Sequence, residues 1–276
     1  MSNFLIRTIT GFLFVIVVVG SAIWNFWAFA AVFGVFVIFG LWEFYCLISR
    51  KNILPHKFLG TFIGVSFYTI SIFNIYGIGV KYTEILYLLI FITSGFVFFI
   101  ELYKKSETPF QNIACTFLGI IYIAIPFSLL VMLNNYATGA FGIFTFPVLF
   151  FFMLWANDTF AYLVGMAIGK HRLFERISPK KTWEGAAGGL FFTLILAVIY
   201  SIYFDFLKLP TWLGLAVIIV VLGNYGDLTE SMLKRSVDTK DSGKFFPGHG
   251  GILDRFDSVL LSVPVVFLYL KIIDLI

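Results

Sequence analysis

The residues most capable of chemistry are concentrated near the C-terminal end, between positions 227 and 257. Eleven of the chain's 34 charged residues lie in this stretch, six acids and five bases. They are Asp227, Glu230, Lys234, Arg235, Asp238, Lys240, Asp241, Lys244, Asp254, Arg255 and Asp257. A polybasic lipid-binding segment would consist mostly of Lys and Arg. The mixed signs instead favour a site that holds a cation and phosphates together.

A glycine-rich turn lies inside this charged stretch, at Pro247-Gly248-His249-Gly250-Gly251, and an apolar run begins directly after it. Glycine lets backbone N–H groups approach an anion closely, and a helix N-terminus favours phosphate. Asp254 and Asp257 are three residues apart at the start of the apolar run, so one helix face carries both. Glycine clusters also mark ordinary turns, and acids at helix starts are often only dipole partners, so each residue has a structural alternative.

The end of the preceding apolar run supplies a second set of polar side chains. Asp227, Ser231 and Lys234 are spaced to share one face of a helix. Carboxylates that reach from the ends of different helices form a natural site for a hard cation. Mg²⁺ takes oxygen ligands and usually keeps water and substrate phosphates as the others.

A second polar island interrupts the apolar run at 141–168. Asn157, Asp158 and Thr159 lie inside this run, which is longer than one crossing requires, so we expect it to be tilted or broken near Asp158. A basic and polar segment follows at 170–184. Glu43, near the end of the second apolar run, could join the site, although an acid paired within its helix is the favoured alternative.

The elements that must position these residues are membrane helices. The chain is 60% hydrophobic and only 12% charged, whereas soluble domains are about 25% charged, so a soluble enzyme is excluded. We expect an all-α, polytopic membrane protein with nine spans of about 20 residues each. They are expected at 4–23, 27–48, 58–80, 85–102, 113–133, 141–168, 185–203, 212–226 and 252–273.

The basic residues predict the orientation of these spans. With the N-terminus inside and the C-terminus outside, sixteen of the nineteen Lys and Arg residues face the cytoplasm, and only Lys81, Lys208 and Lys271 do not. Both polar islands then lie on the cytoplasmic side. We divide the chain into N-terminal helices at 1–135 and a catalytic region at 136–276 that contains the charged loop 227–257. The net charge of +4 is too small to indicate a nucleic-acid partner.

The charged loop resembles the signature of the phosphatidate cytidylyltransferases, the CDP-diacylglycerol synthases. The resemblance is carried by Ser231, Leu233, Lys234, Arg235, Lys240 to Lys244, Pro247 to Gly251, Asp254, Arg255 and Asp257. A second segment is similar to another part of the family's pattern, at Asp158, Ala161, Tyr162 and Ser178 to Gly185. The first five spans carry little that identifies them.

The resemblance implies a Mg²⁺-dependent nucleotidyltransferase at the cytoplasmic face of a bacterial-type inner membrane. It would condense CTP with phosphatidic acid in the bilayer to give CDP-diacylglycerol and pyrophosphate. The resemblance makes Asp227 and Asp254 the metal ligands, with Asp257 as a third candidate, and adds a second, monovalent cation such as K⁺. Family members also form homodimers.

Two groups of residues complete the hypothesis. The residues expected to compensate charge during the reaction are Lys234, Arg235, Lys244 and Arg255. The residues expected to bind the nucleotide or its phosphates are Asp158, Ser178, Lys180, Lys181, Thr182, Ser231, His249, Gly250 and Gly251. The alternatives are a CTP-dependent lipid kinase, which would release CDP rather than pyrophosphate, and an ion or phosphate transporter, which commonly carries paired interrupted segments that this chain lacks.

Overall fold

The structure, a computed structural model, describes residues 3–75, 77–136, 145–243, 245–248 and 250–275. Within these residues, nine helices are long and apolar enough to cross a membrane. They are Leu5–Trp24, Phe26–Lys51, Lys57–Ile75, Thr83–Lys104, Pro109–Met132, Phe146–Ile168, Trp183–Tyr203, Leu209–Ser236 and Leu253–Asp274. The prediction of an all-α, multi-pass membrane protein with nine spans is confirmed. Its orientation in the bilayer stays a prediction.

Of the two alternatives expected for the sixth span, tilted or broken near Asp158, the break is absent, and the tilt stays a prediction. Helix α7 (Phe146–Ile168) continues without interruption through Asp158. Its 23 residues suffice for one crossing, so no break is required by length. Backbone hydrogen bonds inside a helix are unaffected by the polarity of its side chains, and the Asn157 amide reaches the neighbouring Asp158 carboxylate at 3.3 Å.

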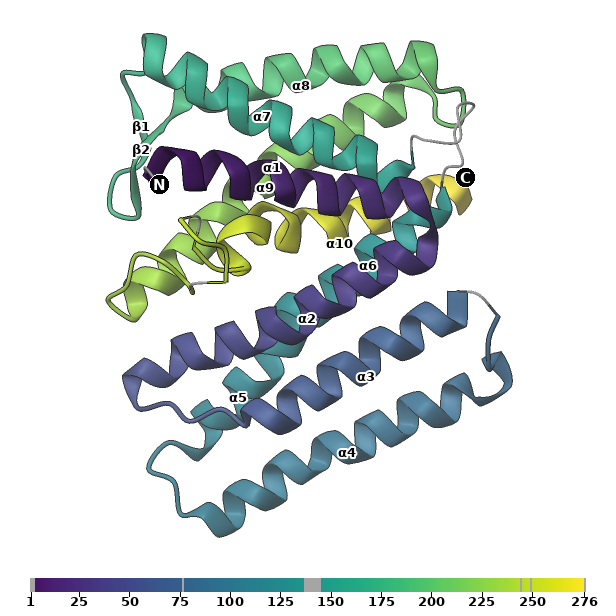
Figure 1. The fold of residues 1–276 in the computed structure, drawn as a ribbon, viewed down its shortest axis with the longest axis vertical. Coiled ribbons are helices and arrows are strands. Elements are labelled where there is room, and N and C mark those ends of the chain that lie inside the picture. The colour runs from purple at the N-terminus through teal and green to yellow at the C-terminus, as the bar shows by residue number, and fades with distance from the viewer. Residues whose placement is uncertain (1–2, 76, 137–144, 244, 249, 276) are drawn as a thin grey trace. The chain divides into compact units, whose positions relative to one another are not determined.

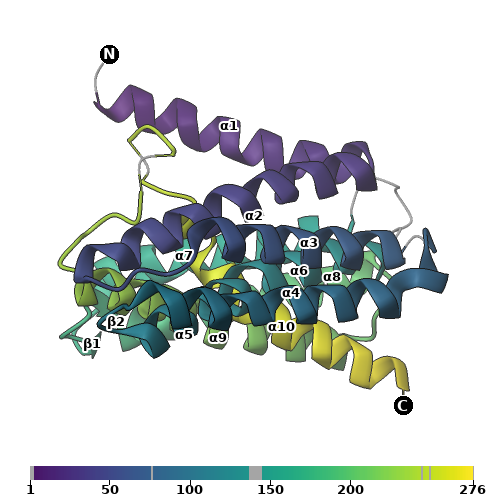
Figure 2. The ribbon, with the colours of Figure 1, turned by 90° about the horizontal axis from the view of Figure 1, so that it is seen from below.

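The chain forms two compact units, each described here by itself. Unit 1 consists of Met1–Met132 and Ser236–Phe256, and unit 2 of Leu133–Arg235 and Asp257–Ile276. The helices of unit 1 are α1 (Asn3–Trp24), α2 (Phe26–Ile48), α3 (Lys57–Ile75), α4 (Thr83–Lys104), α5 (Pro109–Gly119) and α6 (Ile125–Met132). Short 3₁₀ turns lie at Ser49–Lys51, Val80–Tyr82 and Leu133–Tyr136. Helices α1 and α2 meet at one end and diverge towards the other (Figure 2).

An aromatic cluster forms part of the core of unit 1. The rings of Phe33 and Phe127 lie 5.6 and 5.1 Å from that of Phe256, and Phe29 lies 4.5 Å from Phe33. All four side chains are buried. Phe256 therefore fixes the start of the last helix, α10 (Leu253–Leu275), in the core of this unit through contacts that stabilise aromatic pairs by about 0.5–1.5 kcal/mol each beyond their buried area.

The fifth span contains a local irregularity with a clear cause. A π-helical turn at Ile120–Ala124 joins α5 to α6, and Pro126 follows it. Proline has no N–H to donate, so the carbonyl group four residues earlier loses its usual partner. A π-bulge is a common local adjustment in such a place.

A buried polar network joins the ends of α3, α4 and α5 in unit 1. Glu101 Oε1 accepts a hydrogen bond from Asn112 Nδ2 at 2.9 Å and lies 3.1 Å from His56 Nε2. Burial lowers the pKa of His56, and the Glu101 carboxylate opposes this shift. The Leu54 N–H donates to Asn112 Oδ1 at 2.6 Å, so the network also holds the α2–α3 connection.

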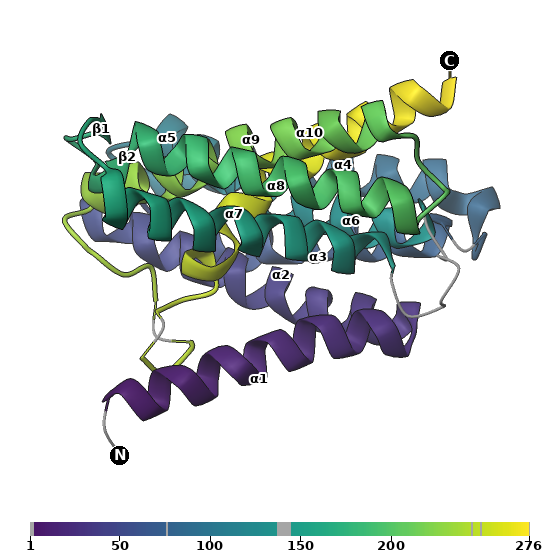
Figure 3. The same ribbon diagram turned by 90° about the horizontal axis from the view of Figure 1, so that it is seen from above.

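Unit 2 is built on α7, α8 (Trp183–Tyr203) and α9 (Leu209–Ser236), with the remainder of α10. Helices α7 and α8 run side by side, as Figures 1 and 3 both show. A short antiparallel hairpin of β1 (Arg172–Phe174) and β2 (Ser178–Thr182) connects them. No strands were predicted from the sequence in this part of the chain.

Glycine allows α7 and α8 to approach closely. A methyl group on Gly185 would lie 2.6 Å from the Ala161 carbonyl oxygen and 3.2 Å from the Gly165 Cα atom. One on Gly189 would overlap the Asn157 side chain. Close backbone contact through small residues is the usual way in which membrane helices associate. The geometry therefore gives these glycines a packing role.

This packing predicts that Gly185→Ala destabilises unit 2. The atom that the new methyl group would meet belongs to the backbone of α7, so the helices must separate, at a cost of about 1–3 kcal/mol. Gly95→Ala in α4 is the matched control, because nothing lies within 4 Å of its added methyl group. Thermal unfolding of the detergent-purified protein should show a lower midpoint for Gly185→Ala and an unchanged or slightly higher one for Gly95→Ala. Equal midpoints would contradict the packing argument.

Candidate functional site

A cavity of about 420 Å³ in unit 2 collects several of the predicted site residues. Its polar lining comes from α7, the hairpin and α9, and consists of Asp158, Tyr162, Arg172, Lys180, Lys181, Thr182, Asn224 and Asp227. The volume lies within the range of about 300–1,000 Å³ that is usual for small-molecule pockets. Asp227, from the charged stretch 227–257, therefore lines the same cavity as Asp158 and the basic residues of the segment 170–184.

The hairpin determines which basic side chains reach the cavity. Strand β2 pairs with β1 so that Thr182 lies opposite Arg172 and Ser178 opposite Phe174. This register places Arg172 beside the end of β2 that carries Lys180 and Lys181. Thr182 then caps α8, because its hydroxyl oxygen accepts a hydrogen bond from the Gly185 N–H at 3.2 Å.

Acidic side chains face these bases across the cavity. Lys181 Nζ and Asp227 Oδ2 form an ion pair at 2.5 Å. Asp158, on α7, also lines the cavity and interacts electrostatically with both of these groups. Asp257 interacts electrostatically with Asp227, Asp158 and Lys181. Three carboxylates therefore interact with Lys181, and Asp227 is the one that forms an ion pair with it.

Close packing between α9 and α10 in unit 2 brings Asp257 to this place. A methyl group on Gly226 would overlap the carbonyl oxygen of Asp257 and would lie 3.0 Å from the Ser258 Cα atom. The hydroxyl group of Ser231 donates to Asp227 Oδ1 at 3.3 Å, so the expected shared face of Asp227 and Ser231 is present. Lys234, one turn further on, is paired with Glu230.

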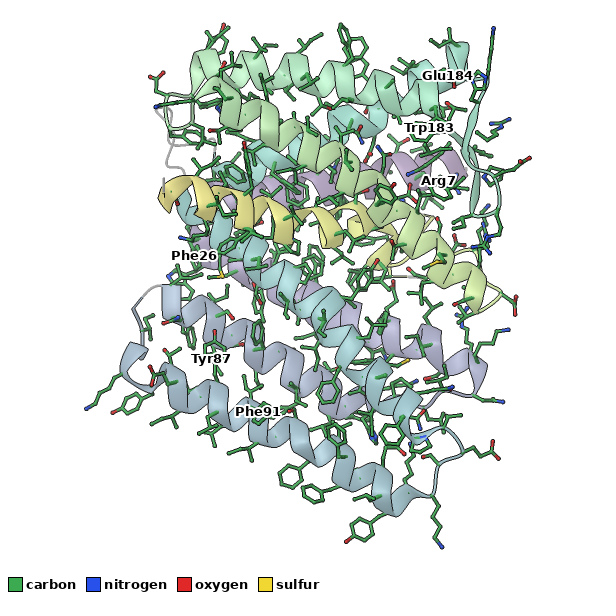
Figure 4. All side chains as sticks on the ribbon, turned by 180° about the vertical axis from the view of Figure 1, so that it is seen from behind. Arg7, Phe26, Tyr87, Phe91, Trp183 and Glu184 are labelled. Atoms are coloured by element: carbon green, nitrogen blue, oxygen red, sulfur yellow. The ribbon has the colours of Figure 1, made fainter. Side chains whose placement is uncertain are left out.

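The start of α8 anchors the hairpin. The Glu184 carboxylate accepts hydrogen bonds from the Lys170 N–H at 3.1 Å and the His171 N–H at 3.2 Å, and lies 2.6 Å from His171 Nδ1. Figure 4 shows Glu184 and Trp183 at this end of α8, next to the strands. Glu184 therefore ties the hairpin to the helix that follows it.

The chemistry available here is the binding of phosphates and of a hard cation. Arg and Lys donate charge-assisted hydrogen bonds to phosphate oxygens, and carboxylates are the side chains that Mg²⁺ prefers. Among the described residues, no three His, Cys, Asp or Glu side chains are placed to hold a metal ion by themselves. A Mg²⁺ ion commonly takes one or two carboxylates and completes its shell with water and substrate phosphates, so the donor set fits an ion that binds together with a nucleotide.

A second polar cluster lies in unit 1 and contains Asp254. One oxygen of its carboxylate, Oδ2, accepts hydrogen bonds from the Ser242 N–H at 3.0 Å and the Gly251 N–H at 2.8 Å, and lies 2.8 Å from the Ser242 hydroxyl oxygen. The Gly251 N–H, which was expected to bind phosphate, therefore donates a hydrogen bond to Asp254. Gly250 has a φ of +83°, which favours glycine at this position.

Asp227 and Asp254 belong to different units, so their expected sharing of one cation stays a prediction. Lys244 and His249 lie outside the described residues. Arg235 and Arg255 are exposed, at the end of α9 and in the first turn of α10. Ser178 begins β2, opposite Phe174.

Arg172 and Asn224 were not predicted as site residues, and Glu43 was named only as a residue that could join the site. Arg172 and Asn224 line the cavity in unit 2. The position of Arg172 depends on the hairpin, whose strands are too short to show an alternating pattern. Glu43 contacts the Asp254 cluster in unit 1, and its bonds span about 200 positions of the chain. The only sequence signal for Glu43 was an acid within an apolar span.

Comparison with known proteins adds an independent finding. The profile of the cytidylyltransferase family matches residues 5–273 of the chain. A phosphatidate cytidylyltransferase of Staphylococcus haemolyticus is 40% identical over 165 residues, which cover 59% of this chain and 61% of that protein. The phosphatidate cytidylyltransferase of Bacillus subtilis is 39% identical over 168 residues, 60% of this chain and 61% of that protein. The aligned part therefore spans about three fifths of the length of these relatives.

The anchoring by Glu184 predicts that Glu184→Ala loosens the hairpin. Without the carboxylate, the hairpin loses its bonds to the start of α8, and local opening exposes its basic residues to trypsin. We expect cleavage between residues 170 and 181 to become severalfold faster in limited proteolysis followed by mass spectrometry. Glu175→Ala, at the exposed turn of the same hairpin, is the control and should be cleaved at the native rate. Equal rates for both variants would disprove the anchoring role.

Proposed function

Because the chain belongs to the cytidylyltransferase family, we propose that it is a phosphatidate cytidylyltransferase. It would condense CTP with phosphatidic acid to CDP-diacylglycerol and pyrophosphate. The observation that carries this proposal is the cavity in unit 2, where Arg172, Lys180 and Lys181 lie together with Asp158 and Asp227 at the ends of membrane helices. Such a cavity suits a polyphosphate that arrives from water and a phosphate that is anchored in lipid.

The reaction needs charge neutralisation more than proton transfer. A phosphatidate oxygen would form a bond to the α-phosphorus of CTP, and the bond from that phosphorus to the oxygen of the β-phosphate would break, so that pyrophosphate leaves. A phosphate monoester is already largely ionised near neutral pH, so no general base is required. The obstacle is the approach of two anions, which phosphoryl-transfer enzymes overcome by positioning and electrostatic stabilisation.

The residues of unit 2 divide this work in our proposal. Arg172 and Lys180 would hold the phosphate chain of CTP. Lys181 would also bind a phosphate oxygen, which would weaken its ion pair with Asp227. Asp227 would hold the metal, with Asp158 and Asp257 beside it. Mg²⁺, when bound, would supply further neutralisation of phosphate charge. Asp254 stays a second ligand predicted from the family resemblance.

The remaining expectations belong to the same proposal. The multi-pass protein would lie in a bacterial inner membrane with its site towards the cytoplasm, where CTP is available. A monovalent cation such as K⁺ and a homodimeric assembly rest on the resemblance alone. The basic residues that predict this orientation include Arg172, Lys180 and Lys181, which line the cavity.

The proposal predicts a product pattern that separates it from lipid kinases. Purified protein in mixed micelles with Mg²⁺, phosphatidic acid and CTP labelled at the α-phosphate should transfer label to lipid and release pyrophosphate. CTP labelled at the γ-phosphate should leave the lipid unlabelled. Transfer of the γ-label to phosphatidic acid or to an added polyprenol would instead establish a kinase. A competent preparation that forms neither product would overturn the proposal.

The role given to Asp227 predicts that Asp227→Asn strongly impairs turnover. The amide keeps the size of the side chain but removes the charge that holds both the cation and Lys181, so we expect a loss of about 100-fold or more in kcat. The Mg²⁺ concentration for half-maximal rate should rise. Asp205→Asn, an exposed acid in the α8–α9 connection, should retain native activity. Full Mg²⁺-dependent turnover by Asp227→Asn would refute the metal-ligand role.

A further inference from the structure

Glu43 lies on α2, and its carboxylate is directed at the segment that leads into α10 in unit 1. Glu43 Oε1 accepts hydrogen bonds from the Ser242 hydroxyl at 2.5 Å and from the Leu253 N–H at 3.0 Å, and Oε2 accepts one from the Ile252 N–H at 3.0 Å. The first N–H groups of a helix have no partner within it, and a negative charge near them is favourable. Glu43 thus caps α10 from another helix.

Two glycines of the signature segment adjoin this carboxylate. A methyl group on Gly243 or on Gly251 would overlap the side chain of Glu43. Neither glycine has a positive φ, so its backbone conformation is one that alanine adopts without strain. The space that Glu43 occupies therefore explains why these positions exclude a side chain.

The Glu43 contacts continue directly to Asp254. The Ser242 hydroxyl that contacts Glu43 Oε1 at 2.5 Å is also 2.8 Å from Asp254 Oδ2. Asp254 Oδ2 further accepts the N–H groups of Ser242 and Gly251. The two carboxylates therefore hold opposite sides of one short segment. Moving either of them changes the setting of the other.

We propose that Glu43 is a positioning residue for Asp254. It holds Ser242, Ile252 and Leu253 in place, and so sets the direction of the Asp254 carboxylate at the start of α10. This inference rests on the proposed function, in which Asp254 is a predicted ligand of the Mg²⁺ ion. Groups that orient a metal ligand commonly change metal affinity or activity about 10–100-fold when they are removed. A lipid-facing or solvent-facing acid would have no such effect.

The first test compares Glu43→Gln with Glu101→Gln. Both replace a carboxylate of unit 1 by an amide of the same size, but Glu101 belongs to the His56 and Asn112 network instead of the Asp254 cluster. In Glu43→Gln an amide group replaces one carboxylate oxygen opposite an N–H donor of α10, so kcat should fall about 10–100-fold and the half-saturating Mg²⁺ concentration should rise. Mg²⁺ binding to the substrate-free protein, measured by isothermal titration calorimetry, should weaken by a similar factor. Glu43→Asp should recover part of both. Glu101→Gln should alter thermal stability but leave Mg²⁺ dependence unchanged.

The second test uses the contact between Gly251 and Glu43. Gly251→Ala should lower activity about tenfold or more in the native background, because the methyl group displaces the carboxylate. In a Glu43→Ala background the overlapping atoms are absent, so Gly251→Ala should add little further loss. Additive effects in this double-mutant cycle would show that the two positions do not interact.

These outcomes separate the inference from the proposed function. If the native protein forms no CDP-diacylglycerol, the proposed function fails before any variant is compared. If the native protein is active and Glu43→Gln retains both its kcat and its Mg²⁺ dependence, the inference fails alone. Should the Glu43 variants not fold, Ser242→Ala and Gly251→Ala decide, since both disturb the Glu43 contacts without substituting Glu43 itself. Native Mg²⁺ dependence in both of these variants would overturn the positioning role.

Discussion

The cost of placing charge beside hydrocarbon is the constraint on which this structure depends. An isolated ionised side chain within a span is expensive, so acids in membrane helices need partners. Asp227 is paired with Lys181, Glu101 with His56 and Asn112, and Glu43 with the start of α10. In each case the partner comes from a different helix or loop. The hydrogen bonds and ion pairs of these acids therefore also fix the conformation of the connections and helix ends.

This constraint also explains why unit 2 has a strand hairpin at the end of two membrane helices. The segment between α7 and α8 must present Arg172 and Lys181 to a cavity, and flexible basic side chains on a loose loop would not stay there. Pairing of β1 with β2 satisfies the backbone, and Glu184 fastens the pair to α8. Close contact through Gly185 then sets the distance between α7 and α8. The cavity therefore depends on the packing of α7 against α8 as well as on its charged side chains.

The spans and the chemical character of the site could be predicted from the sequence, because both depend on local composition. Runs of about 20 apolar residues identify the helices. The crowding of charge at 227–257 predicts a functional region, and Asp227 from this stretch lines the cavity. The continuity of α7 through Asp158 could not be predicted from local composition. A polar Asp158 in an apolar run is compatible with a broken or a continuous helix, and the surroundings of its side chain decide between them.

Long-range partners were beyond the reach of the sequence for a different reason. Nothing near Glu43 in the chain shows that its hydrogen-bond donors are at 242, 252 and 253. The pairing of Arg172 with the end of β2 could not be predicted either, because a three-residue strand such as β1 is too short to show an alternating pattern. Hydropathy gives the positions of helices along the chain. It gives no information about which side chains of different helices contact one another.

The contact between α2 and the start of α10 has a consequence for biosynthesis. Ribosomes add about 5–20 residues per second, and the Ile252 donor follows Glu43 by 209 positions, so the two are made about 10–40 s apart. During that interval α2 already carries its carboxylate while the Ser242, Ile252 and Leu253 donors do not yet exist. The nascent helix must leave Glu43 near water or next to a temporary partner. Helix α2 can therefore reach its final packing only after the start of α10 has been translated.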